Sequence, residues 1–161
     1  MNDSGYFEYN GDNPKEFGEQ KYQESIKNYQ QMEKRFKDLP DTRIVMVGTS
    51  PYDETVQLKE NVPFKTKNET IKRIVEYQKE SAAKNNWEFT DLNAPMVALN
   101  QQNQQKDPAF TLCGSDRIHP DNDVHMVMAY LFLKAQGFVG KEVAEMEINA
   151  NEKQAVKAEN C

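Results

Sequence analysis

The feature that most constrains the fold of this chain is an alternation of helix-type and strand-type segments. Residues 42–47 (TRIVMV) form a continuous apolar-rich run ahead of Gly48, which is typical of a strand buried on both faces of a parallel sheet. A second short strand is predicted at 87–92. Amphipathic helices are predicted around these strands, at 14–37, at 66–84, from Met96 onward and at 123–136. This order predicts an α/β fold with a parallel sheet and helices on both faces.

Several local signals define the predicted helices. Thr66 and Glu69 have the spacing of a capping box at the start of the second helix. The polar run 100–105 (NQQNQQ) is expected to end the third helix. The fourth helix, with Asp123 as a possible N-cap and Gly137 as its stop, has dense apolar content and is predicted to be the most buried. Its aromatic residues and one preceding tryptophan are expected in the core: Trp87, Tyr130, Phe132 and Phe138.

The predicted sheet is too small for the helices around it. Parallel sheets of this class are usually about five strands wide, whereas only two such strands are predicted here. Leu, Ile, Val and Phe make up 32 of 161 residues, which is a low share for a chain that must bury a core. Either the domain is rich in helices with wide solvent-exposed faces, or it is part of something larger.

The C-terminal part has a different pattern. Residues 144–150 (AEMEINA) alternate strictly between apolar and polar side chains, as in a half-exposed antiparallel strand. The sequence therefore predicts an α/β domain over residues 1–138. Residues 139–161 are predicted to be a linker and the truncated start of a β-rich module.

The charge of the chain excludes several classes of partner. It has 26 acidic and 20 basic residues and a pI near 5.0, which argues against binding to nucleic acid or anionic membranes. No apolar run approaches the roughly 20 residues that cross a bilayer, so no membrane insertion is expected. No signal peptide is apparent at Met1. The parent protein is periplasmic or secreted among the options left open. The sequence does not specify an oligomeric state.

The segment 114–120 (GSDRIHP) is the most informative for chemistry. Asp116 and His119 lie three residues apart on a loop that enters a helix, where α/β folds place catalytic groups. Asp116 can orient one ring nitrogen of His119, so that the other acts as a general base. The alternative from the residues alone is that Asp116 and His119 are a loop ion pair or helix-entry residues. Arg117 is expected in solvent, with contact to an anionic or sugar substrate as its alternative.

A metal site is the other chemistry considered for this region. Asp116 and His119 are followed by three further carboxylates or imidazoles, at Asp121, Asp123 and His125. The loop lacks the glycine and the bidentate glutamate of oxygen-rich metal loops, so helix-capping carboxylates are the simpler interpretation. No metal and no cofactor are expected.

The residues Asp116-Arg117-Ile118-His119-Pro120, followed by His125, Met128-Ala129-Tyr130 and Leu133, resemble the last conserved block of the SGNH (GDSL-type) hydrolases. In that family D-x-x-H-P supplies the triad acid and base. Met1-Asn2-Asp3 resembles the end of the family's G-x-N-D block, which implies that Asn2 donates its side-chain amide to the oxyanion hole. Val124 stands where the family has Gly. The resemblance implies a three-layer α/β/α, flavodoxin-like fold.

The family's G-D-S block, which carries the nucleophile, is absent from this sequence. None of the five serines lies in a strand-to-helix elbow: Ser4, Ser25, Ser50, Ser81 and Ser115. The resemblance therefore implies that residues 1–138 are the C-terminal portion of an esterase domain whose N-terminal strands are missing. Such an esterase would act on a small-molecule or carbohydrate ester, and this portion would be inactive alone because the attacking serine is missing. The alternative function is a non-catalytic α/β binding or interaction module.

Overall fold

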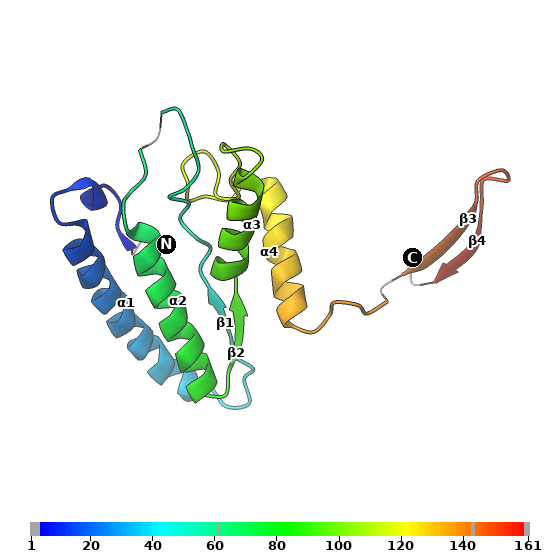
Figure 1. The fold of residues 1–161 in the computed structure, drawn as a ribbon. Coiled ribbons are helices and arrows are strands. Elements are labelled where there is room, and N and C mark those ends of the chain that lie inside the picture. Colours follow the sequence, from blue (N-terminus) through cyan, green and yellow to red (C-terminus); the bar gives the residue numbers. More distant parts are fainter. Residues whose placement is uncertain (1–3, 61, 143, 160–161) are drawn as a thin grey trace.

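The computed structural model describes residues 4–60, 62–142 and 144–159. A 3-10 helix, η2 (Phe7–Asn10), precedes the long helix α1 (Pro14–Lys37), and strand β1 (Val45–Gly48) follows. Helix α2 (Lys67–Lys84), strand β2 (Glu88–Asp91), helix α3 (Asn93–Gln104) and helix α4 (Asn122–Ala135) complete the α/β part, and strands β3 (Glu145–Asn149) and β4 (Gln154–Glu159) come last (Figure 1).

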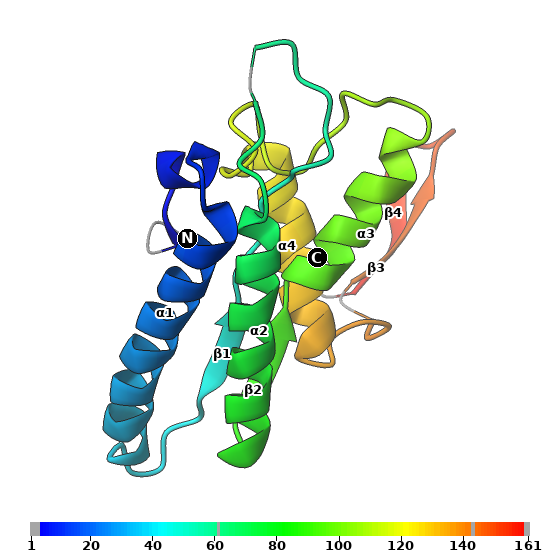
Figure 2. The ribbon, with the colours of Figure 1, turned by 60° about the vertical axis from the view of Figure 1, so that its left-hand side comes forward.

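Strands β1 and β2 form a two-stranded parallel sheet, in which Val45 pairs with Glu88 and Gly48 with Asp91. Helix α2 packs against both strands and α1 packs on α2. Helix α4 contacts β2 from the other side, so the sheet lies between α2 and α4 (Figure 1), and in the turned view α2 lies in front of the strands (Figure 2). The prediction of a mixed α/β fold with a small parallel sheet is confirmed.

Two hydrophobic clusters fill the interior of this part. One is built around Tyr52, Ile71, Val75 and Ile118, on the α2 side. The other joins α3 to α4 through four buried side chains, Leu92, Met96, Leu112 and Val124. Ile118, just before His119, belongs to the first cluster, and Val124, which follows it, belongs to the second. Both clusters therefore connect the predicted functional loop to the core.

Helix α4 is far less buried than its composition predicts. Of its residues only Val124 is buried, and Tyr130 and Phe132 are 53% and 39% exposed. Phe138, just beyond the helix, is 54% exposed. The expectation of core positions is wrong for these three aromatics, because one face of α4 packs on β2 and α3 and a two-stranded sheet cannot cover its remaining face. Asp121, not Asp123, is the N-cap residue.

Helix α3 continues through the polar run that was expected to end it. Asn100 is 2% exposed, and its Oδ1 accepts a hydrogen bond of 2.8 Å from the backbone N–H of Leu112. The Gln104 side chain donates to the carboxylate of Asp53 and to the carbonyl of Phe110, each at 2.9 Å. Amides that look solvent-facing in the sequence are therefore tertiary hydrogen-bonding groups, which sustain the helix.

The N-terminus of α2 is capped from a distant loop. Thr66 has a left-handed backbone and makes no side-chain capping bond, so the predicted capping box does not form. Instead, the carboxylate of Glu54 accepts hydrogen bonds from the backbone N–H groups of Asn68 (2.6 Å) and Thr66 (3.3 Å). This contact also anchors the loop between β1 and α2.

The C-terminal strands form an antiparallel hairpin that extends away from the rest of the chain in Figure 1. The strand expected at 144–150 is observed as β3, and Lys157 pairs with Glu145 across the hairpin at 2.5 Å. Apolar side chains on it are solvent-exposed, with Ile148 at 60% and Val156 at 64%. Among the described helices none is long and apolar enough to cross a membrane.

We predict that Glu54→Ala lowers the free energy of unfolding by about 1 kcal/mol, since loss of a capping side chain has that cost. Glu69→Ala, which removes the carboxylate of the sequence-predicted capping box, should change it by less than about 0.5 kcal/mol. Urea unfolding followed by circular dichroism at 222 nm measures both. A larger loss for Glu69→Ala than for Glu54→Ala would contradict the observed cap.

Candidate active site

Three segments meet near the carboxyl ends of the parallel strands, which is where open α/β sheets place their ligand sites. They are the N-terminal segment 4–10, the loop 49–66 after β1 and the loop 105–121 before α4. Loop 49–66 hydrogen-bonds to loop 105–121 through the backbone pair of Asp53 and Arg117 at 3.0 Å. The segments therefore form one connected region.

Asp116 and His119 are in direct contact on this region. His119 Nδ1 lies 2.5 Å from Asp116 Oδ2, and the side chains are 68% and 48% exposed respectively. Asp116 Oδ1 accepts the backbone N–H groups of Ile118 and His119, both at 2.9 Å. The carboxylate thus fixes the turn and the imidazole together, and the bond through Nδ1 leaves Nε2 for proton transfer.

The electrostatics of Asp116 favour its ionised form. Partial burial raises the pKa of this carboxyl group, but hydrogen bonds from the His119 ring and from the backbone N–H groups of His119 and Ile118 outweigh it, and the pKa is lowered. An ionised carboxylate against Nδ1 stabilises the imidazolium that forms when Nε2 takes a proton.

The turn that carries Asp116 and His119 requires glycine at position 114. Gly114 has a φ of +67°, and a Cβ there would lie 2.3 Å from the carbonyl oxygen of His119. The backbone N–H of Arg117 donates to the carbonyl of Gly114 at 3.1 Å. The chain therefore folds back on itself between Gly114 and His119, which brings the acid and the base to one side.

Arg117 is buried, not solvated as expected from the sequence. It is 2% exposed, and its Nη1 donates to the backbone carbonyls of Asp53 (3.1 Å) and Val56 (2.8 Å). Its backbone has a φ of +69°. A guanidinium satisfies several carbonyls at once, so Arg117 joins the dyad turn to the loop after β1.

Asp53 is a second residue that sequence reasoning missed. Asp53 is 4% exposed. Its carboxylate accepts hydrogen bonds from the backbone and side chain of Thr55 and from the backbone of Val56. It also accepts bonds from Gln104 (2.9 Å) and Thr111 (2.7 Å). One carboxylate therefore connects α3 and both loops. No local motif marks it.

Lys67, the first residue of α2, holds the N-terminal segment. It is fully buried and donates to the backbone carbonyl of Gly5. Its Nζ lies 4.0 Å from the ring centroid of Tyr6 and between 5.6 and 5.8 Å from three further rings, those of Tyr9, Tyr52 and Phe64. Burial lowers the pKa of Lys67 from 10.5 to about 8, and Glu8 opposes this effect. Cation–π contact and one hydrogen bond replace a carboxylate partner.

A cavity of about 430 Å³ opens beside the dyad, and we call it the dyad pocket. It is bounded by the N-terminal segment, the loop before α2 and the dyad turn. Its lining consists of Tyr6, Phe7, Asn10, Glu60, Val62, Phe64, Asp116, Ile118 and His119. An apolar wall with a few polar groups at one edge is typical of a small-molecule site.

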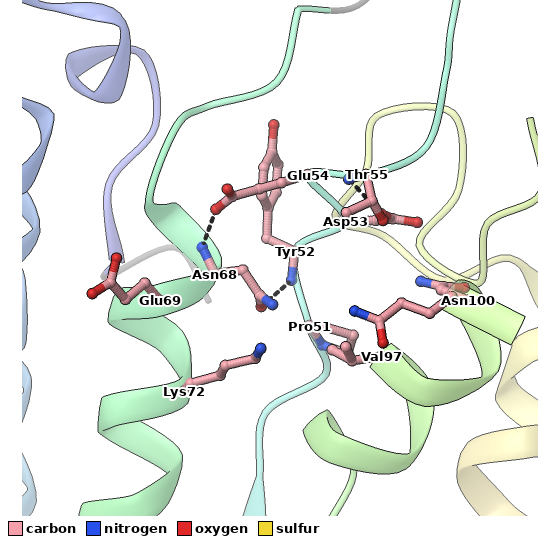
Figure 3. Close-up of a pocket in the computed structure, with 11 residues that line it drawn as sticks. Pro51, Tyr52, Asp53, Glu54, Thr55, Asn68, Glu69, Lys72, Val97 and Asn100 are labelled. Carbon is pink, nitrogen blue, oxygen red and sulfur yellow. Dashed lines mark hydrogen bonds between the residues drawn. The ribbon is translucent and has the colours of Figure 1, made fainter. Parts of the chain in front are cut away.

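A second pocket, of about 260 Å³, lies between the loop after β1, the N-terminal part of α2 and α3. Figure 3 shows Glu54 bonded to the backbone of Asn68, and the Asn68 side chain accepting from the backbone of Tyr52 at 3.1 Å. Its polar groups thus hold the loop and the helix together. It does not include Asp116 or His119, so the dyad pocket is the better candidate for catalysis.

The remaining predicted groups fall in different places. Asn2 lies outside the described residues. Ser4, Ser25, Ser50 and Ser81 are buried, and Ser115 is exposed on the dyad turn. Within the described part of the chain no group of three or more His, Cys, Asp or Glu side chains could hold a metal ion. Burial raises the pKa of the Cys113 thiol to about 12, so this cysteine is not a reactive thiolate.

Comparison with known proteins relates the chain to part of an enzyme. No family model and no curated protein matches it. The solved structure of a gut microbial diltiazem-metabolizing enzyme is similar, with 83% sequence identity and a TM-score of 0.87. The match covers 100% of this chain and 36% of that enzyme's chain, so this chain spans about a third of its length.

We predict that Lys67 makes the protein more stable as the pH rises from 7.5 to 9.5. In this window the folded state releases the Lys67 proton, while the unfolded state, with a pKa near 10.5, keeps it. The unfolded state then binds more protons, so the free energy of unfolding increases with pH. Lys67→Met should remove this increase and Lys72→Met, an exposed change on the same helix, should keep it. Urea unfolding across the window is the measurement.

Arg117→Met is expected to lower the free energy of unfolding by about 2–4 kcal/mol, because it deprives two buried carbonyls of a charged donor. Arg43→Met is the matched control, since Arg43 makes an exposed ion pair with Glu88 at 2.5 Å, and little change is expected there. Equal effects of the two changes in thermal and urea unfolding would show that Arg117 does not hold the loops together.

Proposed function

We propose that this chain supplies the acid–base half of an ester hydrolase of the SGNH type. The observation that carries the proposal is the contact of His119 Nδ1 with Asp116 Oδ2 at 2.5 Å, on a turn beyond the parallel strands and beside an apolar cavity. The D-x-x-H-P motif supports the family assignment. The three-layer α/β/α fold, and the division into 1–138 and 139–161, are parts of the same proposal.

In the proposed mechanism a serine outside this sequence attacks the ester carbonyl. Nε2 of His119 accepts the serine proton and then delivers it to the leaving alcohol. Asp116 keeps the imidazole in the required tautomer and stabilises its protonated form. Asn2 would donate its side-chain amide to the oxyanion of the tetrahedral intermediate. Without the serine, the chain alone is expected to show almost no turnover.

The similar solved structure supports an enzymatic role. That protein metabolizes diltiazem, and part of its chain matches this chain over its whole length. Diltiazem contains an acetyl ester, a bond that Ser-His-Asp chemistry cleaves. Acetyl or other acyl esters of carbohydrates are a further substrate class implied by the family resemblance. A non-catalytic binding module is the competing function, and it predicts that His119 can be replaced without kinetic consequence.

A chimera tests the proposal. In the diltiazem-metabolizing enzyme, the segment matched by this chain is replaced by residues 1–161, and diltiazem loss and hydrolysis of phenyl acetate are followed. The chimera should turn over both compounds, and His119→Ala should reduce kcat about 10³-fold or more, since loss of a triad base has that cost. Asp116→Asn should lower it by a factor of about 10² to 10⁴.

His125→Ala is the matched control in the chimera. His125 is the other histidine of the chain and is exposed on α4, so its replacement should leave kcat within about twofold. Turnover by the His119→Ala chimera at the unmodified rate would remove the hydrolase proposal in favour of a structural role for the dyad.

A further inference from the structure

The wall of the dyad pocket contains apolar side chains that the core does not use. Phe7 is 80% exposed and Val62 is 73% exposed, although both line the cavity that holds His119. Single exposed apolar residues are common on proteins. Here, however, Phe7 and Val62 continue a surface with Tyr6, Phe64 and Ile118, so one contiguous apolar wall faces the dyad.

Phe64 is the centre of this wall. Its ring stacks on Tyr52 at 5.5 Å and 15°, which joins it to the buried cluster. The rings of Tyr6 and Phe7 meet it edge to face, at 6.4 and 5.7 Å. Tyr6 is itself held by the ammonium group of Lys67. The aromatic rings of the wall are therefore packed on one another and joined to the core, in the edge-to-face and stacked arrangements that aromatic pairs prefer.

The charges of the pocket restrict its ligand further. The lining includes the carboxylates of Glu60 and Asp116 and contains no lysine or arginine. An anionic ligand would meet these carboxylates without a cation in the lining to bind it. The rings of Tyr6, Phe7 and Phe64 in the lining give an aromatic ligand group several surfaces on which to pack. Shape and charge thus favour a neutral or cationic aromatic group.

We infer that the dyad pocket binds the aromatic group of an aryl-containing ester, packed against Phe7 and Phe64 with the ester bond directed to His119. The inference rests on the proposed hydrolase function but concerns binding alone. It assigns Phe7 as a substrate-positioning residue and an aryl ester, neutral or cationic, as the substrate class of this site.

Non-hydrolysable amides test the inference on the 161-residue chain itself. Acetanilide represents an aryl acetate, N-cyclohexylacetamide has a saturated ring of the same size, and methyl N-acetyl-β-glucosaminide represents a sugar. The ring protons of the two histidines report binding by NMR, after His125→Asn assigns them. Acetanilide should shift the His119 signal with a Kd of roughly millimolar order, and about two- to tenfold more tightly than the cyclohexyl amide.

Phe7 variants locate the binding surface without disturbing the core. Phe7→Ala should weaken acetanilide binding about two- to tenfold, and Phe7→Tyr should retain it. Phe138→Ala is the control, because Phe138 is also exposed, at 54%, but is not part of the pocket lining. It should leave the Kd unchanged.

Several outcomes would overturn the inference. They are equal affinity for the aryl and cyclohexyl amides, tighter binding of the sugar, a shift at His125 alone, no binding of any probe, and indifference to Phe7→Ala. The hydrolase proposal is judged separately by the kinetics of the chimera. Aryl binding with an inactive chimera would remove the hydrolase proposal and the assignment of an ester substrate, and would leave an aryl-binding pocket. An active chimera without aryl preference would remove this inference only.

Discussion

The buried guanidinium of Arg117 is the contact on which the candidate site depends. It donates to two backbone carbonyls of the loop after β1, from within the turn that carries Asp116 and His119. Arg117, which lies between Asp116 and His119 in the sequence, is therefore buried, while the side chains of Asp116 and His119 are exposed. The same loop also caps α2 through Glu54. The position of the dyad is therefore set by the core and not by the turn alone.

A second constraint comes from the small sheet. Two parallel strands give α2 a packing surface on one side and give α4 only β2 on the other. The apolar residues of α4 consequently remain exposed, which composition and periodicity did not predict. Periodicity reports which face of a helix is apolar, but the area available to cover that face depends on how many strands are present. This is why α4 was predicted to be buried and is observed largely in solvent.

In the candidate site, too, contacts within a few residues could be predicted from the sequence and contacts between distant segments could not. The spacing of Asp116 and His119 was sufficient to predict their contact, because three residues of a turn can bring the two side chains together. Asp53 and Lys67 had no comparable signal. Key partners of these residues lie far away in the chain: Gly5 is 62 residues from Lys67, and Arg117 is 64 residues from Asp53. Long-range contacts of this kind leave no trace in a window of sequence.

The amino-acid sequence alone determined the order of helices and strands, the parallel type of the first sheet, the hairpin strand at the end and the contact of Asp116 with His119. Each of these follows from interactions within a few residues or from periodicity along one element. Only the tertiary structure decided that Glu54 caps α2, that Arg117 is buried and that aromatic rings from two segments line the cavity beside His119. Those features need segments far apart in the chain to meet, and burial of a shared apolar surface brings them together.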